Sequence, residues 1–227
     1  MQRRLTTGLM ALSLLLFSAP AHAFEAWTSY EVRVPLDDPA SPGPHWMKLV
    51  NDLRYGANYP GIGQVLVRLG PVWEVNSFLT LATHFTTNAE RASLAPFKPE
   101  FRLELEPTVR FRLGDVRINN RVRLERRMFV DEARWRVRDR IQFNYNPDSW
   151  AWAPFIWNEF FVEDGAYNQN RLSLGISGSH GENASMRIGY LLRSREDGGS
   201  WDQTHALSVG FTFSPVVDPL IDDGPGL

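Results

Sequence analysis

The fold is decided by the stretch Phe101-Arg-Leu-Glu-Leu-Glu-Pro-Thr-Val-Arg-Phe-Arg-Leu113, in which apolar and charged residues alternate. The pair Gly114-Asp115 follows it, and a second alternating run extends over residues 116–128. A third run places arginine at every second position from Arg134 to Arg140. Because side chains alternate between the two faces of a strand, a period of two indicates β-structure. We therefore expect three consecutive antiparallel strands, each with one apolar face and one charged face.

The charged face of this three-strand segment is dominated by arginine. Eleven arginines and three glutamates occupy it between residues 101 and 143. A face open to water would more often include lysine, serine and threonine, so we expect these side chains to be enclosed in a lumen. Two charged residues of the later chain, Glu159 and Arg171, are plausible further members. The expected lumen-lining residues are Arg102, Glu104, Glu106, Arg110, Arg112, Arg117, Arg121, Arg123, Glu125, Arg127, Arg134, Arg136, Arg138, Arg140, Glu159 and Arg171.

The first 23 residues have the features of a secretory signal peptide. Arg3-Arg4 supply a positive start, residues 9–17 an apolar run, and Ala21-His22-Ala23 a cleavage site with small residues. The apolar run is too short for a transmembrane helix, although a retained membrane anchor is the alternative. Cleavage after Ala23 leaves 204 residues, which fit one domain, with 22 basic and 26 acidic side chains. We therefore expect an exported and mildly acidic protein.

The rest of the chain continues the strand pattern and contains no helix of useful length. Further strands are expected over residues 46–55, 62–75, 78–86, 150–162, 169–179, 185–193 and 204–213. Residues 24–34 alternate weakly and break the even count, either as half of a further pair, as a periplasmic segment or as a segment inside the fold. The prediction is an all-β fold, a single antiparallel transmembrane β-barrel of about 10–12 strands over residues 24–213. Residues 214–227, rich in proline, glycine and aspartate, are expected to form a disordered tail.

The lengths of the connections favour a membrane location. Short connections are expected at residues 76–77, 114–115, 146–149 and 179–183, and longer ones at 88–99, 129–133, 163–168 and 194–202. Bacterial outer-membrane barrels alternate in this way between periplasmic turns and outer loops. Trp135 and Tyr145, at the two ends of one apolar face, fit the aromatic girdles of such barrels. A soluble barrel or sandwich with an ordinary apolar core is the alternative.

Strict alternation also predicts which side chains are neighbours. Asp139 falls on the apolar face at about mid-depth, where a β-bulge would rotate it inward. A two-residue turn at Gly114-Asp115 fixes the register of the strands on either side. Counting back from this turn places Glu106 opposite Arg123, as an ion pair across the hairpin.

An arginine-lined lumen is compatible with three functions. In the first, the surplus of arginine attracts anions, and the barrel is a narrow anion-selective channel. In the second, arginines and glutamates form an ion-pair network that braces and plugs a structural barrel. In the third, the barrel is a membrane-embedded hydrolase. His205 and Ser208 fall on opposite strand faces, however, so we expect no enzyme and assign no catalytic residues.

Several kinds of site are not expected in this chain. The absence of cysteine excludes disulfides and thiolate-bound metals. The histidines are scattered and the carboxylates lie among arginines, so we predict no metal site and no cofactor. Nucleic acid is not an expected partner, because the chain is exported and glutamates interrupt its basic faces. The expected partners are outer-membrane lipid and small anionic solutes, and the oligomeric state is left open.

Several segments, taken in order, resemble one protein family. They are Trp27, Arg121-Val-Arg-Leu-Glu-Arg-Arg127, Arg134-Trp-Arg-Val-Arg138, Asn158-Glu159-Phe160 after Pro154-Phe155, Asn170-Arg171 with Gly175, and Gly189-Tyr190. In this order and spacing they resemble the DUF2490 family of outer-membrane β-barrels, over nearly all of residues 24–213. The resemblance implies the barrel and its location, and it implies no reaction. The residues after Phe213 depart from a barrel that ends on its final strand.

Overall fold

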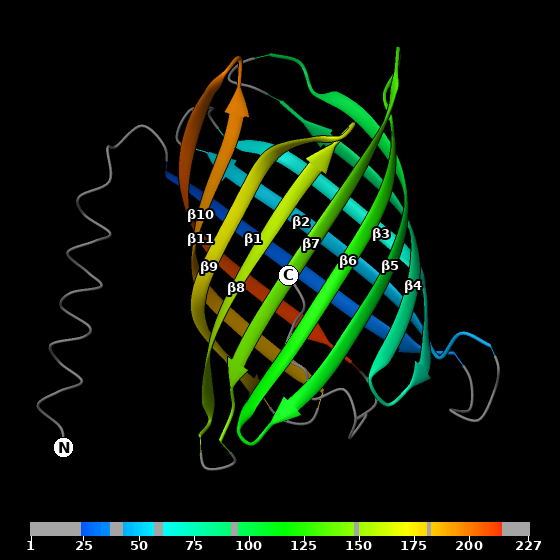
Figure 1. Ribbon diagram of the computed structural model, residues 1–227, viewed down its shortest axis with the longest axis vertical. Helices are drawn as coiled ribbons and strands as arrows, with labels where there is room; N and C mark the ends of the chain where they lie inside the picture. The colour runs from blue at the N-terminus through cyan, green and yellow to red at the C-terminus, as the bar shows by residue number, and fades with distance from the viewer. Residues whose placement is uncertain are drawn as a thin grey trace, which may run out of the picture.

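The structure is a computed structural model that describes residues 24–36, 43–56, 61–91, 95–147, 150–180 and 183–214. In these residues the chain forms eleven β-strands that close into a barrel (Figure 1). The strands are β1 (Phe24–Pro35), β2 (Trp46–Gly56), β3 (Ile62–Asn76), β4 (Leu79–Glu90), β5 (Lys98–Leu113), β6 (Val116–Met128), β7 (Ala133–Tyr145), β8 (Trp152–Glu163), β9 (Ala166–His180), β10 (Ala184–Asp197) and β11 (Ser200–Phe213).

The predicted all-β barrel is confirmed, and the count of eleven strands lies within the predicted range. The number of strands is odd because residues 24–34, whose role the sequence leaves open, lie in a full strand of the barrel wall, β1. It pairs antiparallel with β2 and parallel with β11, where Trp27 lies opposite Ser208. The barrel is therefore antiparallel at every seam except β1–β11, since an odd number of strands needs one parallel pair to close.

The predicted signal peptide, residues 1–23, and the predicted tail beyond Ser214 lie outside the described residues. Among the described residues, no helix has the length and the apolar character that a membrane crossing requires. The eleven strands begin at Phe24 and end at Phe213.

The predicted alternation of short and long connections holds between β3 and β7 and fails after β7. Only Asp164-Gly165 separates β8 from β9, and only Gly198-Gly199 separates β10 from β11, although longer loops are expected at both places. The strands also extend further than the sequence indicates, because β4 continues to Glu90 and β10 to Asp197. Polar residues in these segments therefore belong to strand ends and not to loops. Connection length gives no support to a membrane location.

The two tight turns have the backbone that two-residue hairpins require. The φ angle is 48° at Asp164 and 85° at Gly165, and it is 58° at Gly198 and 87° at Gly199. Positive φ at both central residues is the pattern of a type I′ turn, whose twist matches that of the flanking strands. Glycine adopts this conformation without steric cost, and aspartate is one of the few other residues that tolerate it.

The β5–β6 hairpin has the register predicted from its turn. Gly114-Asp115 separates the two strands, and Arg112 lies opposite Arg117. Glu106 and Arg123 face each other inside the barrel, and Arg123 Nε donates a hydrogen bond of 2.5 Å to Glu106 Oε2. The two-residue turn therefore sets the inner-face pairs of the whole hairpin.

The alternation of these strands separates an apolar outside from a charged inside. On the outer face of β5 and β7, Leu103, Leu105, Val137 and Ile141 are all more than a third exposed. The side chains between them, such as Glu104 on β5, are buried in the interior. This is the reverse of a soluble barrel, which buries its apolar face.

Asp139 is the exception on this outer face. No bulge interrupts the pairing of β7 with β6 or with β8 near it, and its side chain stays outward and exposed. Its Oδ1 accepts a hydrogen bond of 2.7 Å from the side-chain amide of Asn120, also on the outer face. The suggestion that a bulge rotates Asp139 inward is therefore wrong. A hydrogen-bond donor on the neighbouring strand lowers the cost of a carboxylate among apolar side chains.

The interior has a second wall that differs from the charged one. On β9 and β10, Gly175 and Gly189 face each other, and a Cβ atom at either would lie 2.9 Å from Cζ of Phe155. The absence of side chains at these two positions makes room for the Phe155 ring. That ring forms an apolar cluster with Trp157 and Leu191, so small and aromatic residues lie among the arginines on this side of the barrel.

Candidate functional site

A transverse row of charged side chains crosses the inner wall. Register places Arg121 of β6 beside Arg140 of β7, and Arg140 beside Glu159 of β8. Arg171 of β9 and Arg193 of β10 continue the row. Register partners on one face of a sheet are close enough for their side chains to interact. Four arginines from four strands therefore share this row with one carboxylate.

Glu159 is the central acceptor of the row. It is 1% exposed, and its Oε1 accepts hydrogen bonds from Arg121 at 2.8 Å and from Arg138 at 2.9 Å. A nitrogen of Arg171 lies 3.7 Å from the other carboxylate oxygen. A carboxylate this deeply buried is stable only where cations and hydrogen bonds replace its water shell. Glu159 therefore links β6, β7 and β9 through their arginines.

Glutamates on β5 and β6 extend the network to other strands. Glu125, fully buried, accepts hydrogen bonds from Arg136 at 2.6 Å and from Arg138 at 3.0 Å. Glu104 accepts a hydrogen bond of 2.8 Å from Arg68 of β3. Together with the contacts of Glu159, these ion pairs join the inner face of β3 to the inner faces of the five strands from β5 through β9. This part of the wall is held by ion pairs.

Two glutamates that the sequence reasoning does not include complete the network near one end. Glu100 accepts two hydrogen bonds of 2.7 Å from Arg102, and it also pairs with Arg127. Glu163 pairs with Arg127 and, at 3.3 Å, with Arg134. Both glutamates continue the inward alternation of their strands, which is the signal that identifies them once the strand ends are known. Glu100 and Glu163 therefore raise the number of carboxylates near the eleven arginines above the three glutamates that the sequence predicts there.

The predicted lumen residues are distributed unevenly along the barrel. Those buried in the interior are Arg102, Glu104, Glu106, Arg121, Arg123, Glu125, Arg138, Arg140 and Glu159. Those partly buried along the inner wall are Arg127, Arg136 and Arg171, and those nearer the ends are Arg110, Arg117 and Arg134. Arg112 is exposed, and its Nε donates a hydrogen bond of 2.7 Å to the carbonyl of Gly114. Arg112 therefore belongs to the rim at the β5–β6 turn and not to the lumen.

Two arginines of the interior form no ion pair within the described part of the chain and stack on aromatic rings instead. The guanidinium carbon of Arg54 lies 3.8 Å from the centre of the Trp27 ring. That of Arg140 lies 5.2 Å from the centre of the Trp157 ring. An aromatic face attracts a cation and orients a planar guanidinium, but it leaves the net charge in place.

A third arginine, Arg187, is stacked and fully buried. Its guanidinium carbon lies 4.4 Å from the centre of the Phe155 ring. None of its three side-chain nitrogens has a hydrogen-bond partner among the described residues. Glu31 attracts Arg187 electrostatically but forms no hydrogen bond or ion pair with it. A buried cation without such a contact is costly, so Arg187 adds weakly compensated positive charge to the interior. We refer to Arg54, Arg140 and Arg187 as the stacked arginines.

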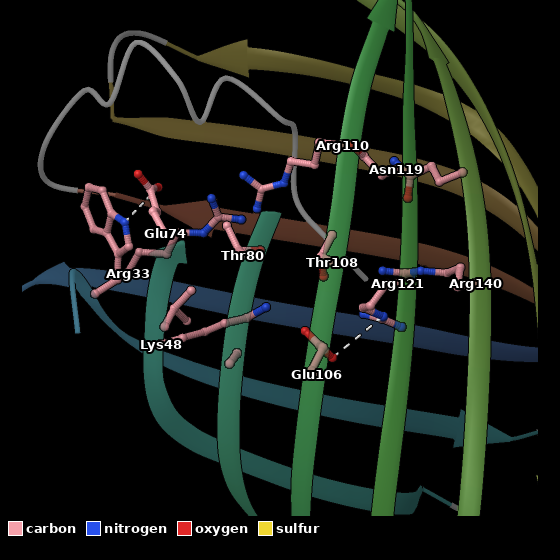
Figure 2. A pocket seen from close by; sticks show the side chains of 14 residues that line it. Arg33, Lys48, Glu74, Thr80, Glu106, Thr108, Arg110, Asn119, Arg121 and Arg140 are labelled. Carbon is pink, nitrogen blue, oxygen red and sulfur yellow. Dashed lines mark hydrogen bonds and ion pairs between the residues drawn. The ribbon is translucent and has the colours of Figure 1, made fainter. Parts of the chain in front are cut away.

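Two cavities occupy the interior. The larger has a volume of about 310 Å³, and its lining includes Arg54, Glu159 and Glu163. The smaller has a volume of about 90 Å³ and is drawn in Figure 2. Within the described chain, Arg121 and Arg140 alone line both cavities. These two arginines, which we call the waist, therefore lie between the two cavities.

The wall of the larger cavity is strongly cationic. Its lining contains thirteen arginines and five carboxylate side chains. Arginines therefore outnumber carboxylates on this surface. Four further glutamates, Glu100, Glu104, Glu106 and Glu125, pair with some of these arginines from outside the lining. The charge of such a surface is focused by the low-dielectric walls around it.

The histidines do not form a reactive constellation in the described part of the chain. His84 is 3% exposed inside the barrel, and His205 lies on the outer wall against the hydroxyl of Tyr190. Ser208 is 4% exposed in the interior, on the opposite face of β11 from His205, as the alternation predicts. No group of three or more metal-binding side chains is present among the described residues.

The fold and the site define a class of protein: a closed β-barrel with buried charged residues. The model of the family described as "Protein of unknown function (DUF2490)" matches residues 24–204. The chain therefore belongs to this family, and the resemblance seen in its sequence is confirmed. No curated protein and no solved structure matches it.

Proposed function

We propose that this chain is an outer-membrane β-barrel whose interior is a narrow, anion-selective passage. The observation that carries the proposal is the larger cavity, where thirteen arginines and five carboxylates line one space. A passage lined by cations admits anions and repels small cations. The proposal assigns no catalytic step to the chain.

The outer surface supports the membrane part of the proposal. Its strand faces are apolar, and aromatic side chains gather at both ends of the barrel. At one end the rings of Tyr145 and Trp150 are 5.5 Å apart, and at the other those of Tyr167 and Trp201 are 5.3 Å apart. All four side chains are more than a third exposed. Aromatic girdles above and below an apolar band are typical of transmembrane barrels, and a soluble barrel has no reason to expose them.

The arrangement of the two cavities supports the passage. They lie toward opposite ends of the barrel and share the waist as a common lining. An anion that crosses the barrel along these cavities would pass Arg121 and Arg140. Arg140 forms no ion pair in the described chain, so it can interact with an anion without first releasing a carboxylate.

The location is tested by fractionating cells that express the full chain. We expect the protein in the outer-membrane fraction, with a band that shifts on heating before electrophoresis, because closed barrels resist detergent unfolding. Recovery as a soluble periplasmic monomer would contradict the proposal and favour the soluble barrel.

The passage is tested with purified protein in planar lipid bilayers. We expect a small, anion-selective conductance, and Arg54→Gln should lower the anion preference because it removes an unpaired cation from the larger cavity. Arg134→Gln is the matched control, since Arg134 lines the same cavity but pairs with Glu132 and Glu163 near the rim. A cation-selective conductance would exclude the anion passage.

A structural barrel with a plugged interior is the second candidate, and the ion-pair network favours it. Glu125 and Glu159 each contact several arginines and occupy the centre of the wall. In that case the folded protein should show no steady conductance in the bilayer experiment. Arg136→Gln with Arg138→Gln should then lower thermal stability, because Glu125 would lose both hydrogen-bond donors.

A further inference from the structure

We propose that the waist is a binding site for a small oxyanion of the phosphate or sulfate type. The donors would be the guanidinium groups of Arg140 and Arg121, held beside Trp157. This inference deepens the proposed function, because it names the kind of group that the passage holds. It rests on the same cationic interior, although binding can be measured where no transport occurs.

The two arginines of the waist lie side by side inside the barrel. They are register partners on adjacent strands and both are directed into the barrel (Figure 2). Arg140 is 4% exposed and Arg121 is 7% exposed, so water reaches them only through the cavities. Two cations side by side repel each other, and an anion between them turns that repulsion into two attractions.

The donors of both guanidinium groups have few acceptors nearby. Arg140 forms no ion pair within the described residues. Nε of Arg121 has no hydrogen-bond partner among them, and it lies 3.7 Å from Oε2 of Glu106, an ion pair that is too long for a hydrogen bond (Figure 2). The indole nitrogen of Trp157 is also buried without a partner there, and Trp157 is only 4% exposed. A buried donor without an acceptor is costly. The donors of Arg140 and Arg121 therefore suit an anion with several oxygens that accept hydrogen bonds.

The carboxylates near Arg140 form their hydrogen bonds with other arginines. Glu159 lies opposite Arg140, but it accepts hydrogen bonds from Arg121 and Arg138. Glu106 accepts its hydrogen bond from Arg123. Glu159 attracts Arg140 electrostatically, but no carboxylate of the described chain forms an ion pair or a hydrogen bond with it, so a ligand oxygen can take that position.

The geometry of Arg140 suits a ligand with several oxygens. Its guanidinium carbon lies 5.2 Å from the centre of the Trp157 ring, so the ring limits the orientations of the planar group. A guanidinium held in this way presents pairs of parallel N–H groups, which match two oxygens of one oxyanion. Chloride offers no such pair of acceptors. We therefore expect phosphate and sulfate to bind more tightly than chloride.

The experiment titrates purified, folded protein in detergent with sodium phosphate and with sodium sulfate, at constant ionic strength set with sodium chloride. Binding is followed by calorimetry and by the shift of the melting temperature. We expect saturable binding of both oxyanions to the wild type. Arg140→Gln should weaken it about tenfold or more, as expected when a charge-assisted hydrogen bond is lost. Arg140→Lys should also weaken it, because lysine keeps the charge and loses the planar pair of donors.

The matched control is Arg134→Gln, which removes an arginine from the larger cavity but away from the waist. Binding to this variant should remain at the wild-type level. Ligand-free Arg140→Gln should melt no lower than the wild type, since Arg140 has no ion pair to lose, whereas phosphate should no longer raise its melting temperature. If Arg140→Gln does not fold, Arg140→Lys carries the comparison.

Three results would overturn the inference: no saturable binding to folded wild type, unchanged binding in the Arg140 variants, or an equal loss in Arg134→Gln. The last would indicate a diffuse field and no site. Failure of the inference is distinguishable from failure of the proposed function. Conductance without saturable oxyanion binding would leave the passage standing, and binding without conductance would leave only the site.

Discussion

Arg138 and Arg140 are two residues apart on the same face of β7, and they differ in their ionic partners. Both lie over an aromatic ring, Arg138 over Phe161 and Arg140 over Trp157. Arg138 donates hydrogen bonds to Glu125 and Glu159, whereas Arg140 forms no ion pair in the described chain. Arg138 belongs to the ion-pair network, and Arg140 is a cation outside that network. The number of arginines alone therefore does not say how many cations in this interior are neutralised. The partner of each guanidinium decides whether it braces the wall or remains available to an anion.

The largest expected effect is on the paired side of this comparison, from Glu159→Gln. The change removes the charge that Arg121, Arg138 and Arg171 share. We expect a loss of about 3–5 kcal/mol in the free energy of unfolding, because breaking a buried pair leaves uncompensated cations. Urea unfolding in detergent or lipid vesicles measures it. Glu132→Gln, on a side chain 50% exposed, is the control and should have almost no effect. Equal stability of the two variants would contradict the structural role of the network.

The opposite sign is expected on the stacked side, from Arg187→Met. Arg187 is fully buried and has no hydrogen-bond partner among the described residues, so an apolar side chain of similar length removes a desolvation cost. We expect a gain of about 2 kcal/mol, within the range found when apolar residues replace buried charges. The same unfolding measurement applies. A clear loss of stability would mean that stacking on Phe155 contributes more than the unpaired charge costs.

A smaller effect is expected in the coupling between Glu106 and Arg123. Their hydrogen bond of 2.5 Å crosses the β5–β6 hairpin. We expect the double variant Glu106→Gln/Arg123→Gln to lose less stability than the two single variants together. The difference should be about 1–2 kcal/mol, as is common for residues in contact. Additive losses would show that the two side chains act independently.

The smallest effect is expected where a paired arginine is exposed. The side chain of Arg134 is 43% exposed and bridges Glu132 and Glu163 near the rim. Solvent screens such pairs, so Arg134→Gln should change the free energy of unfolding by less than about 1 kcal/mol. A loss of stability comparable to that of Glu159→Gln would mean that exposed and buried ion pairs contribute equally to the stability of this barrel.

The sequence predicts the barrel and much of its inner face, because the alternation within a strand can be recognised even where the limits of the loops are wrong. Arg102 to Arg140 alternate so strictly that their inward positions follow from counting. Counting fails at strand ends, where polar composition does not separate a loop from the end of a strand. It therefore leaves out Glu100 and Glu163, one step beyond the assumed limits of β5 and β8.

The partners of the arginines are harder to predict than their direction. Pairing across a hairpin follows from the turn, as for Glu106 and Arg123. Contacts between strands that are distant in sequence, such as Arg68 with Glu104, depend on curvature and closure. Stacking of Arg187 on Phe155 depends in addition on room made by Gly175 and Gly189. A single sequence contains no local signal for such contacts.

The parallel seam between β1 and β11 has a consequence for how the barrel is completed. The other ten seams join strands that follow each other in the chain, and this one joins the first strand to the last. Bringing distant ends together costs loop-closure entropy before any hydrogen bond is gained, so we expect the hairpins to form first. Until β11 is in place, the molecule is a curved open sheet with two bare edges, and edges of this kind recruit other strands. We therefore expect the pairing of the final 14-residue strand with β1 to be the step that turns an aggregation-prone open sheet into a closed barrel.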